Sequence, residues 1–437
     1  MRRSPLQNCF DYAAHPTRIQ GNIIEASLPA AAIGEVCEVL SSINDTSLAG
    51  YARVIGFNGS RTMLSLLCDS AGFSQHHLLV PTGKAFPIPL GEALLGAVLD
   101  PLGNICARLD GATETALIAT EHRPIDVEAL HFSEREPIAE KLITRIRAID
   151  GLLTCGHGQR LGIFAAAGCG KTSLMNMLIE HSEADVYVVG LIGERGREVT
   201  EFVETLRHSP RRHKCVLVYA TSDYASLERC NAALVATTVA EYFRDQGRRV
   251  VLFLDSLTRF ARALRDVALA AGEAPARRGY PASVFDALPR VLERPGNSLS
   301  GSITAFYTVL LEGDDEPDPD APDENPLRFS DGHIYLSRKL SAASHYPAID
   351  ILHSASRVAG QVTDARQQAL AGAMRGLLTR LEEMQTLIDL GEYRLGDNAE
   401  NDRAHAQKQA LWDFLRQDAD QAEEFGQTLR LMHAFDA

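Results

Sequence analysis

Apolar and polar positions follow three different patterns along the chain. From about residue 18 to 87, short alternating segments are separated by Gly, Asn, Asp and Ser, which predicts a small closed β-barrel. From residue 151 to about 358, strand-like apolar runs alternate with runs of helical period, which is typical of a mostly parallel sheet flanked by helices. Beyond that point the pattern is helical. We therefore expect a barrel domain over residues 1–90, an α/β domain over 91–360 with a transitional segment at 91–150, and a helical domain over 361–437.

The predicted helical domain begins with a helix that carries one apolar stripe. Its apolar positions are spaced by 4, 3, 4, 3 and 4 residues, which places them on one face. We expect this face to form the core of a helical bundle, and not a surface that binds a partner. The positions are Leu370, Met374, Leu377, Leu381, Met384 and Ile388.

Charge, hydropathy and cysteine content restrict the class of protein. The 437 residues include 43 Lys plus Arg and 57 Asp plus Glu, so the formal net charge is −14, which disfavours a general nucleic-acid binder. No apolar run approaches the roughly 18 residues of a membrane span, and the N-terminus does not read as a secretory signal. The eight cysteines are scattered without a CxxC pair, which argues against disulfides and thiolate zinc sites. We expect a soluble, cytoplasmic protein.

The most specific chemical signal is a phosphate-binding loop. An apolar strand ends at Phe164, and AAAGCGKT at residues 165–172 then leads into a helical run. Glycines let backbone N–H groups surround an anion at a helix N-terminus. Lys171 would reach the β- and γ-phosphates of a nucleotide, and Thr172 would offer a hydroxyl to Mg²⁺. The first loop position is Ala165 where glycine is usual. The expected nucleotide-binding residues here are Ala167, Gly168, Cys169, Gly170, Lys171, Thr172 and Ser173.

Two acidic residues follow strand-like runs further along the chain. Asp255 ends the run VVLFLD, which suits a carboxylate on the Mg²⁺ side of the phosphates, although a residue here can instead cap the next helix. Glu194 follows VYVVGLIG and can polarise a water molecule for in-line attack on the γ-phosphate. The alternative for Glu194 is a surface ion-pair turn within GERGRE. Their order after the phosphate-binding loop favours the catalytic interpretation of both.

An arginine far downstream, Arg357, is a further candidate. Most single arginines are surface residues. An arginine in this place can instead stabilise the transferred charge in the site of a neighbouring subunit, which requires a ring of subunits.

These segments, in this order, resemble the catalytic core shared by rotary ATP synthases and type III secretion ATPases. The resemblance covers nearly the whole chain and includes LIGERGREVTEF, LDSLTRFARALRDVALAAGE, GYPASVFDALPRVLER and HYPAIDILHSASRV. It is stronger to injectisome ATPases of the invasion type than to the flagellar export ATPase. It implies a RecA-like P-loop domain between a β-barrel and a helical domain, with ATP as substrate and Mg²⁺ as cofactor.

The resemblance also implies roles for individual residues. Glu194 matches the glutamate that activates water, and Arg195 matches its neighbouring phosphate contact. Asp255 matches the acid on the Mg²⁺ side, with Thr172, and Arg259 matches the arginine that follows it at the nucleotide. Lys171 matches the lysine of the phosphate-binding loop.

Two further positions match parts of the family's site that lie outside these motifs. Tyr346 falls where the family stacks a tyrosine on adenine. Arg357 falls where the family's arginine finger enters the site of the adjoining subunit.

The resemblance implies an assembly and partners. The family forms homohexamers associated peripherally with the cytoplasmic face of the bacterial inner membrane. Its members release and unfold chaperone-bound export substrates, and they contact the export gate and the stator and central-stalk proteins of the secretion apparatus. No nucleic-acid partner is expected.

The chain departs from the family pattern at two places. Residues 323–330 read DENPLRFS where the family usually has DE-x-RSIL, which puts loop packing near the subunit interface in question. Arg145 stands where glycine is usual in TGxRAID. We expect that the backbone at Arg145 does not need a positive φ, or that the turn is altered.

The function expected from the sequence is therefore an ATP-hydrolysing homohexameric motor for type III protein export. Four alternatives have weaker support, and the first is a flagellar export ATPase, to which the resemblance is less close. A catalytic subunit of a rotary proton-coupled ATPase would carry an acidic DELSEED-like lever that the helical domain lacks. A ring-shaped RNA helicase fits poorly with the net charge of −14. A docking scaffold that binds nucleotide without hydrolysing it does not need Glu194.

Overall fold

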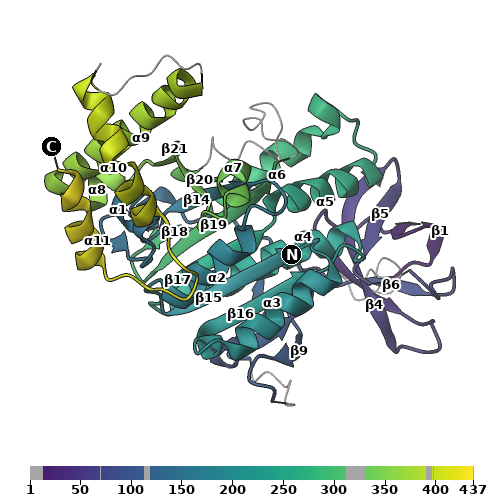
Figure 1. The fold of residues 1–437 in the computed structure, drawn as a ribbon. Helices are drawn as coiled ribbons and strands as arrows, with labels where there is room; N and C mark the ends of the chain where they lie inside the picture. Colours follow the sequence, from purple (N-terminus) through teal and green to yellow (C-terminus); the bar gives the residue numbers. More distant parts are fainter. Residues whose placement is uncertain are drawn as a thin grey trace.

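The computed structural model of the chain describes residues 13–68, 70–112, 119–311, 330–389, 396 and 398–436. The part of the atypical segment 323–330 up to residue 329, and the side chain of Ile388, lie outside the described residues. Figure 1 shows the strands of the N-terminal part and the helices of the C-terminal part at opposite ends of a central α/β domain. Within the described ranges, no helix is long and apolar enough to cross a membrane.

The N-terminal part is a closed antiparallel barrel. Its six strands follow the order β1-β2-β5-β4-β3-β6. Ala14, just before β1, exchanges backbone hydrogen bonds of 3.0 and 2.9 Å with Leu79 in β6, and this pair closes the sheet on itself. Ile24, Leu64 and Leu66 are fully buried inside, as the alternating sequence predicts. The strands are β1 (Pro16–Gln20), β2 (Ile23–Ala26), β3 (Val36–Leu40), β4 (Leu48–Asn58), β5 (Arg61–Leu66) and β6 (Leu78–Pro81).

The transitional segment forms short strands that join the barrel to the α/β domain. A two-stranded ladder pairs β7 with β10, while β8 and β9 extend one edge of the central sheet. The elements are β7 (Pro87–Leu90), β8 (Ala97–Leu99), β9 (Ile105–Arg108), β10 (Glu121–Pro124), β11 (Arg135–Glu136), β12 (Lys141–Leu142), α1 (Arg147–Leu152) and β13 (Cys155–Gly156).

The central sheet is mostly parallel, as predicted. Its strand order is β21-β20-β14-β19-β17-β15-β16-β8-β9, and only the edge pairs with β21 and β9 along this path are antiparallel. All seven residues of β15 are buried, because helices cover both faces of the sheet. The strands are β14 (Arg160–Ala165), β15 (Val186–Ile192), β16 (Cys215–Ala220), β17 (Arg249–Asp255), β18 (Gly296–Ser298), β19 (Ser302–Leu310), β20 (Gly332–Leu336) and β21 (Ile349–Ser356).

The helices divide between the two faces of this sheet. Helices α2 and α3 share one apolar core with the C-terminal helices, and α4, α5 and α6 pack in a second core on the other face. The carboxyl ends of the parallel strands lie on one side of the domain, and α2, α3 and α5 begin there, just after β14, β15 and β17. The helices are α2 (Lys171–His181), α3 (Gly196–His208), α4 (Ser226–Asp245), α5 (Leu257–Ala270), α6 (Ala282–Leu292) and α7 (Arg338–Ala342).

The C-terminal part is helical, and its apolar stripe is a core as predicted. Leu370, Met374, Leu377 and Met384 are buried on α9. Arg147 at the start of α1 connects this part to the central domain. Its Nε donates to the carbonyl oxygen of Phe414 at 2.9 Å. The helices are α8 (Ala359–Val362), α9 (Ala365–Asp389), α10 (Ala399–Leu415) and α11 (Phe425–Met432).

Of our two expectations for Arg145, the one that its backbone does not need a positive φ is wrong. Arg145 has a φ of 60°, the left-handed conformation that glycine adopts without steric cost. Its backbone N–H donates to Asp150 at 2.8 Å, and its guanidinium forms 3.0 Å ion pairs with Glu183 and Glu424. These contacts offset a conformational cost of about 1 kcal/mol.

Candidate active site

The phosphate-binding loop connects β14 to α2. Gly168 and Gly170 have φ values of 82° and 86°, and Gly170 is the residue just before α2. The positive φ favours glycine at position 170, and a Cβ there would also crowd the Tyr346 ring at 3.1 Å. Ala165 is still part of β14, paired with Leu310, and its backbone does not need glycine there. Cys169 is buried and belongs to the apolar core that α2 and α3 share.

Lys171 lies between two carboxylates that come from the ends of other strands. Its ammonium group contacts Asp255 Oδ1 directly and lies 3.5 Å from Glu194 Oε1. Burial alone would lower the pKa of Lys171, but the charges of Asp255 and Glu194 hold that pKa above its ordinary value. The lysine is therefore a cation at neutral pH. The carboxylates of Asp255 and Glu194 hold it beside the phosphate-binding loop.

Asp255 faces the loop and does not cap α5. The cap is Ser256, whose hydroxyl oxygen accepts the backbone N–H of Arg259 at 3.3 Å. The carboxylate of Asp255 accepts a 2.7 Å hydrogen bond from the Thr308 hydroxyl on β19. The helix-cap alternative for Asp255 is therefore wrong, and its carboxylate is directed at the Lys171 side of the site.

Glu194 is only 5% exposed and lies just after β15. Its Oε2 lies 2.5 Å from Arg259 Nη1, which also donates to the Gly193 carbonyl oxygen at 2.7 Å. Burial raises the pKa of Glu194, although the charges of Lys171 and Arg259 oppose that rise. A carboxylate with a raised pKa beside a phosphate-binding loop has the properties of a general base.

The donor set fits a magnesium–nucleotide site. Thr172 and Ser173 are exposed in the first turn of α2, and Asp255 supplies a carboxylate nearby. Hydroxyl, carboxylate and phosphate oxygens are the ligands that Mg²⁺ prefers. Among the described residues there is no group of three or more His, Cys, Asp or Glu suited to a metal ion, and Mg²⁺ bound to a nucleotide does not need one.

Arg195 does not meet the phosphate-binding loop in this structure. It lies at the residue just before α3, its side chain is largely exposed, and its guanidinium pairs with Glu198 at 3.2 Å. The expected phosphate contact of Arg195 therefore stays a prediction.

Tyr346 packs against the phosphate-binding loop although it is far away in sequence. Its ring lies over Gly170, and its hydroxyl oxygen is 2.9 Å from that of Ser341, which donates to the Gly168 carbonyl oxygen at 3.2 Å. The ring is 42% exposed, so one side of it is accessible to a ligand. This placement suits a stacking partner for a nucleotide base.

Arg357 lies at the amino ends of the parallel strands, on the side of the sheet opposite to the phosphate-binding loop. Its backbone N–H donates at 2.8 Å to the carbonyl oxygen of Asp331, which is itself bonded to Arg160 at the start of β14. The loop follows the far end of that strand, about 16 Å away at the usual rise per residue. Arg357 is exposed, and among the described residues its guanidinium has no hydrogen-bond or ion-pair partner. It therefore cannot reach the site of its own subunit.

Comparison with known proteins agrees with this geometry. A family model for the nucleotide-binding domain of the ATP synthase alpha/beta family matches residues 145–356, and a model for the EscN ATPase C-terminal domain of type III secretion systems matches residues 363–434. The SPI-1 type 3 secretion system ATPase of Salmonella typhi is 58% identical, over 98% of both chains. The chain belongs to the type III secretion ATPases. The predicted family, fold and ATPase activity are thereby confirmed.

Solved structures of relatives have the same fold as this chain. The assembled EscN ATPase of enteropathogenic E. coli has a TM-score of 0.89 to this type III secretion ATPase, with 40% identity over 97% of this chain and 100% of EscN. EscN with its central stalk EscO gives 0.86, with 39% identity over the same shares. A flagellum-specific ATP synthase of Pseudomonas aeruginosa is 43% identical over 94% of this chain and 90% of its own, so flagellar use remains the alternative.

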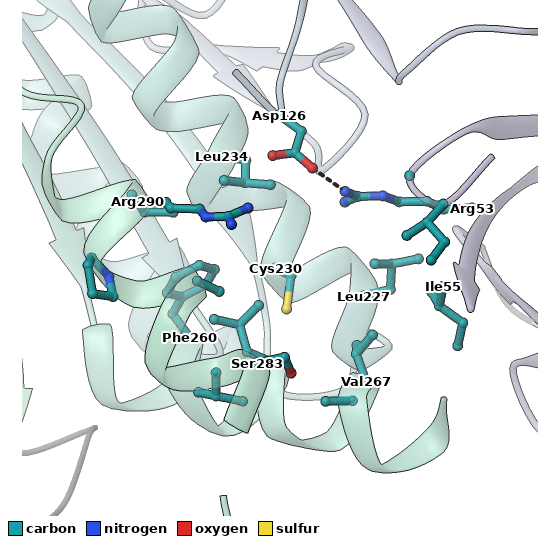
Figure 2. A pocket seen from close by; sticks show the side chains of 18 of the residues that line it. Arg53, Ile55, Asp126, Leu227, Cys230, Leu234, Phe260, Val267, Ser283 and Arg290 are labelled. Atoms are coloured by element: carbon teal, nitrogen blue, oxygen red, sulfur yellow. Dashed lines mark hydrogen bonds and ion pairs between the residues drawn. The ribbon is translucent and has the colours of Figure 1, made fainter. Parts of the chain in front are cut away.

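The type III secretion ATPase also has a cavity of about 820 Å³ away from this site. Figure 2 shows it between the barrel, at Ile55, and helices that contribute Leu227, Phe260 and Arg290. No residue of the phosphate-binding loop lines it. The cavity therefore marks the junction of barrel and ATPase domain, and it contributes none of the site's polar groups.

Several polar residues around the site were not predicted from the sequence. Thr308 lies within the apolar run SITAFYTVL, and Ser341 lies five residues before Tyr346. Thr308 meets Asp255 only because β19 inserts between β14 and β17 in the sheet. No local motif encodes that strand order.

Proposed function

We propose that the chain hydrolyses ATP in a homohexameric ring whose sites are shared between neighbouring subunits, and that this reaction energises type III protein export. One observation carries the proposal. The cluster of Lys171, Glu194 and Asp255 lies at the carboxyl ends of the parallel strands, whereas the exposed Arg357 lies at their amino ends. If the carboxyl ends of the strands in one subunit face the amino ends of the strands in the next, every site in the ring receives an Arg357 from its neighbour.

In the proposed mechanism, Lys171 moves from its carboxylate partners to the β- and γ-phosphate oxygens. Glu194 orients a water molecule for in-line attack on the γ-phosphorus and accepts its proton, while the bond to the bridging oxygen breaks to give ADP and phosphate. Thr172 and Asp255 would hold Mg²⁺, which neutralises phosphate charge when bound. Tyr346 stacks on adenine, and Arg259 keeps Glu194 in position.

Arg357 of the neighbouring subunit would stabilise charge on the transferred phosphoryl group. Arginine fingers of this kind raise turnover by about 10³- to 10⁵-fold. The guanidinium is unpaired in the described part of the chain and can therefore enter another site without breaking a contact. We infer that Arg195 contacts phosphate only after the ring closes.

The relatives support the proposed surroundings of the ring. EscN was solved as an assembled ATPase and in complex with its central stalk EscO. By analogy, we infer that this chain binds a stalk protein, a stator protein, the export gate and chaperone–effector complexes. Its place would be the cytoplasm, peripherally at the inner membrane, with no nucleic-acid partner.

The test is ATPase activity per subunit as a function of protein concentration, with Glu194→Gln as control. We expect activity to rise steeply as rings form and to vanish in Glu194→Gln, which should still bind ATP. Specific activity that stays constant down to concentrations where only monomers are present would contradict a shared site. Retained turnover in Glu194→Gln would remove Glu194 from its role.

A further inference from the structure

A buried amide lies beneath the residue proposed as the finger. Gln159, just before β14, is 0% exposed. Its Nε2 donates to the Asp331 carbonyl oxygen at 3.1 Å and to Ser356 Oγ at 3.0 Å, and its Oε1 accepts the Gly156 N–H at 2.9 Å. One amide hydrogen is thus used on Ser356, the residue before Arg357, and the other on Asp331, whose carbonyl oxygen also accepts the Arg357 N–H.

Asp331, just before β20, links Arg357 to the start of β14. Its carbonyl oxygen accepts the Arg357 N–H at 2.8 Å. Its carboxylate accepts from the backbone N–H and Nε of Arg160 at 3.0 and 3.1 Å. The backbone at Arg357 is therefore attached, through Asp331, to Arg160 at the start of β14.

Packing here leaves little space for movement. A Cβ on Gly332 would lie 2.6 Å from the Ala355 carbonyl oxygen and 3.2 Å from Gln159 Nε2. Ser356 Oγ also donates to the Thr154 carbonyl oxygen at 2.8 Å, so this hydroxyl is bonded on two sides. The backbone that leads into Arg357 is therefore closely packed and hydrogen-bonded, whereas the Arg357 side chain is exposed.

We propose that Gln159 is a positioning residue that aims Arg357 into the site of the adjacent subunit. This inference rests on the proposed function, in which Arg357 acts in trans. Gln159 immediately precedes β14, and the phosphate-binding loop follows it, so β14 separates the two sites to which one subunit contributes by about 16 Å. A misplacement of about 1 Å at a reacting group reduces turnover by about 100-fold.

The test variant is Gln159→Met, which keeps the volume and removes the amide. We expect turnover to fall about 10- to 100-fold with ATP affinity unchanged, since the phosphate-binding loop is intact. Ser356→Ala removes one of the two acceptors of the Gln159 amide, and its turnover should also fall. The matched control is Thr237→Val, because Thr237 is equally buried but bonds only within α4, to Ala233 at 2.8 Å, and should keep wild-type turnover.

Mixed rings separate a finger defect from a loop defect. Gln159→Met mixed with Lys171→Ala should recover up to about a quarter of wild-type activity, because the Lys171→Ala chains supply intact fingers to intact loops. Gln159→Met mixed with Arg357→Ala should not recover, since both chains then lack a working finger. Native mass spectrometry would confirm that the rings are mixed.

The opposite pattern would overturn the inference. Recovery with Arg357→Ala but not with Lys171→Ala would mean that Gln159 supports its own loop, and full turnover of Gln159→Met would mean that it positions nothing. A mixture of Arg357→Ala with Lys171→Ala tests the finger by itself. If that mixture does not recover activity in confirmed mixed rings, the proposal of a site shared between subunits is wrong, and so is the proposed role of Gln159.

Discussion

The hydroxyl of Thr308 donates a 2.7 Å hydrogen bond to Asp255, across two strands that are neighbours in the sheet but 53 residues apart in sequence. This bond orients a carboxylate that also contacts Lys171. Groups that orient metal ligands in this way typically affect metal affinity by about 10- to 100-fold. Thr308 therefore belongs with the proposed Mg²⁺ site although it would touch no metal.

We expect Thr308→Val to raise the Mg²⁺ concentration needed for half-maximal ATPase activity by about 10-fold. Titrating Mg²⁺ at saturating ATP measures this. Thr304→Val is the matched control, because Thr304 lies on the same strand, is equally buried and accepts the Gly158 N–H away from the site. An equal shift in both variants would attribute the effect to the packing of β19 and not to Asp255.

The pH dependence of turnover should follow Glu194. The base must be ionised, so activity falls as pH drops through the pKa of Glu194, which burial raises above the ordinary glutamate value. Removing the cation of Arg259, 2.5 Å away, raises this pKa further. The acid limb of kcat in Arg259→Gln should therefore lie at higher pH than in the wild type.

Arg197→Gln is the control for that shift. Arg197 lies three residues after Glu194 but pairs with Glu201 at 2.7 Å, away from the site. Its pH profile should match the wild type. An acid limb that does not move in Arg259→Gln would mean that another group limits turnover at low pH.

Tyr346 should affect nucleotide binding more than chemistry. Stacking of a base on an aromatic ring contributes about 1–3 kcal/mol, so Tyr346→Ala should weaken ATP binding by that amount with smaller loss of turnover at saturation. Tyr346→Phe keeps the ring and loses only the contact with Ser341. Equilibrium binding of ATP to the three proteins measures the difference, and equal affinities would exclude Tyr346 from the base site.

Predictions from the sequence were most reliable where one local motif determines the geometry. The loop glycines, Lys171 and Glu194 follow directly from strand–loop–helix patterns, and the structure brings Lys171 and Glu194 together. The role of Asp255 had two interpretations, because an acid between a strand and a helix can serve either. Only the position of Ser256 as the helix cap decides between them.

Other features depend on contacts that no local pattern encodes. Thr308 contacts Asp255, and Gln159 contacts Ser356 next to Arg357, only because of the order of strands in the sheet. The left-handed Arg145 was predicted wrongly, because its ion pairs come from Glu183 and Glu424, which are distant in sequence. The phosphate contact expected of Arg195 stays a prediction, because in this single chain its guanidinium pairs with Glu198.

Arg147 should be needed for the attachment of the helical part. Its guanidinium donates to the carbonyl oxygens of Phe414 and Asp413 at 2.9 and 3.1 Å, also bonds that of Arg416, and pairs with Glu423 at 3.2 Å. Its side chain is only 9% exposed, so truncation leaves buried carbonyl groups without donors. We expect Arg147→Ala to lower the free energy of unfolding by about 2–4 kcal/mol.

Arg147→Lys is the informative companion variant. It keeps the charge but replaces a planar group with five donors by a single ammonium, which cannot reach three carbonyl oxygens and a carboxylate at once. We therefore expect Lys to recover less than half of the lost stability in chemical denaturation. If Arg147→Lys is as stable as the wild type, the pairing of charge with Glu423 is what matters, and the carbonyl contacts contribute little.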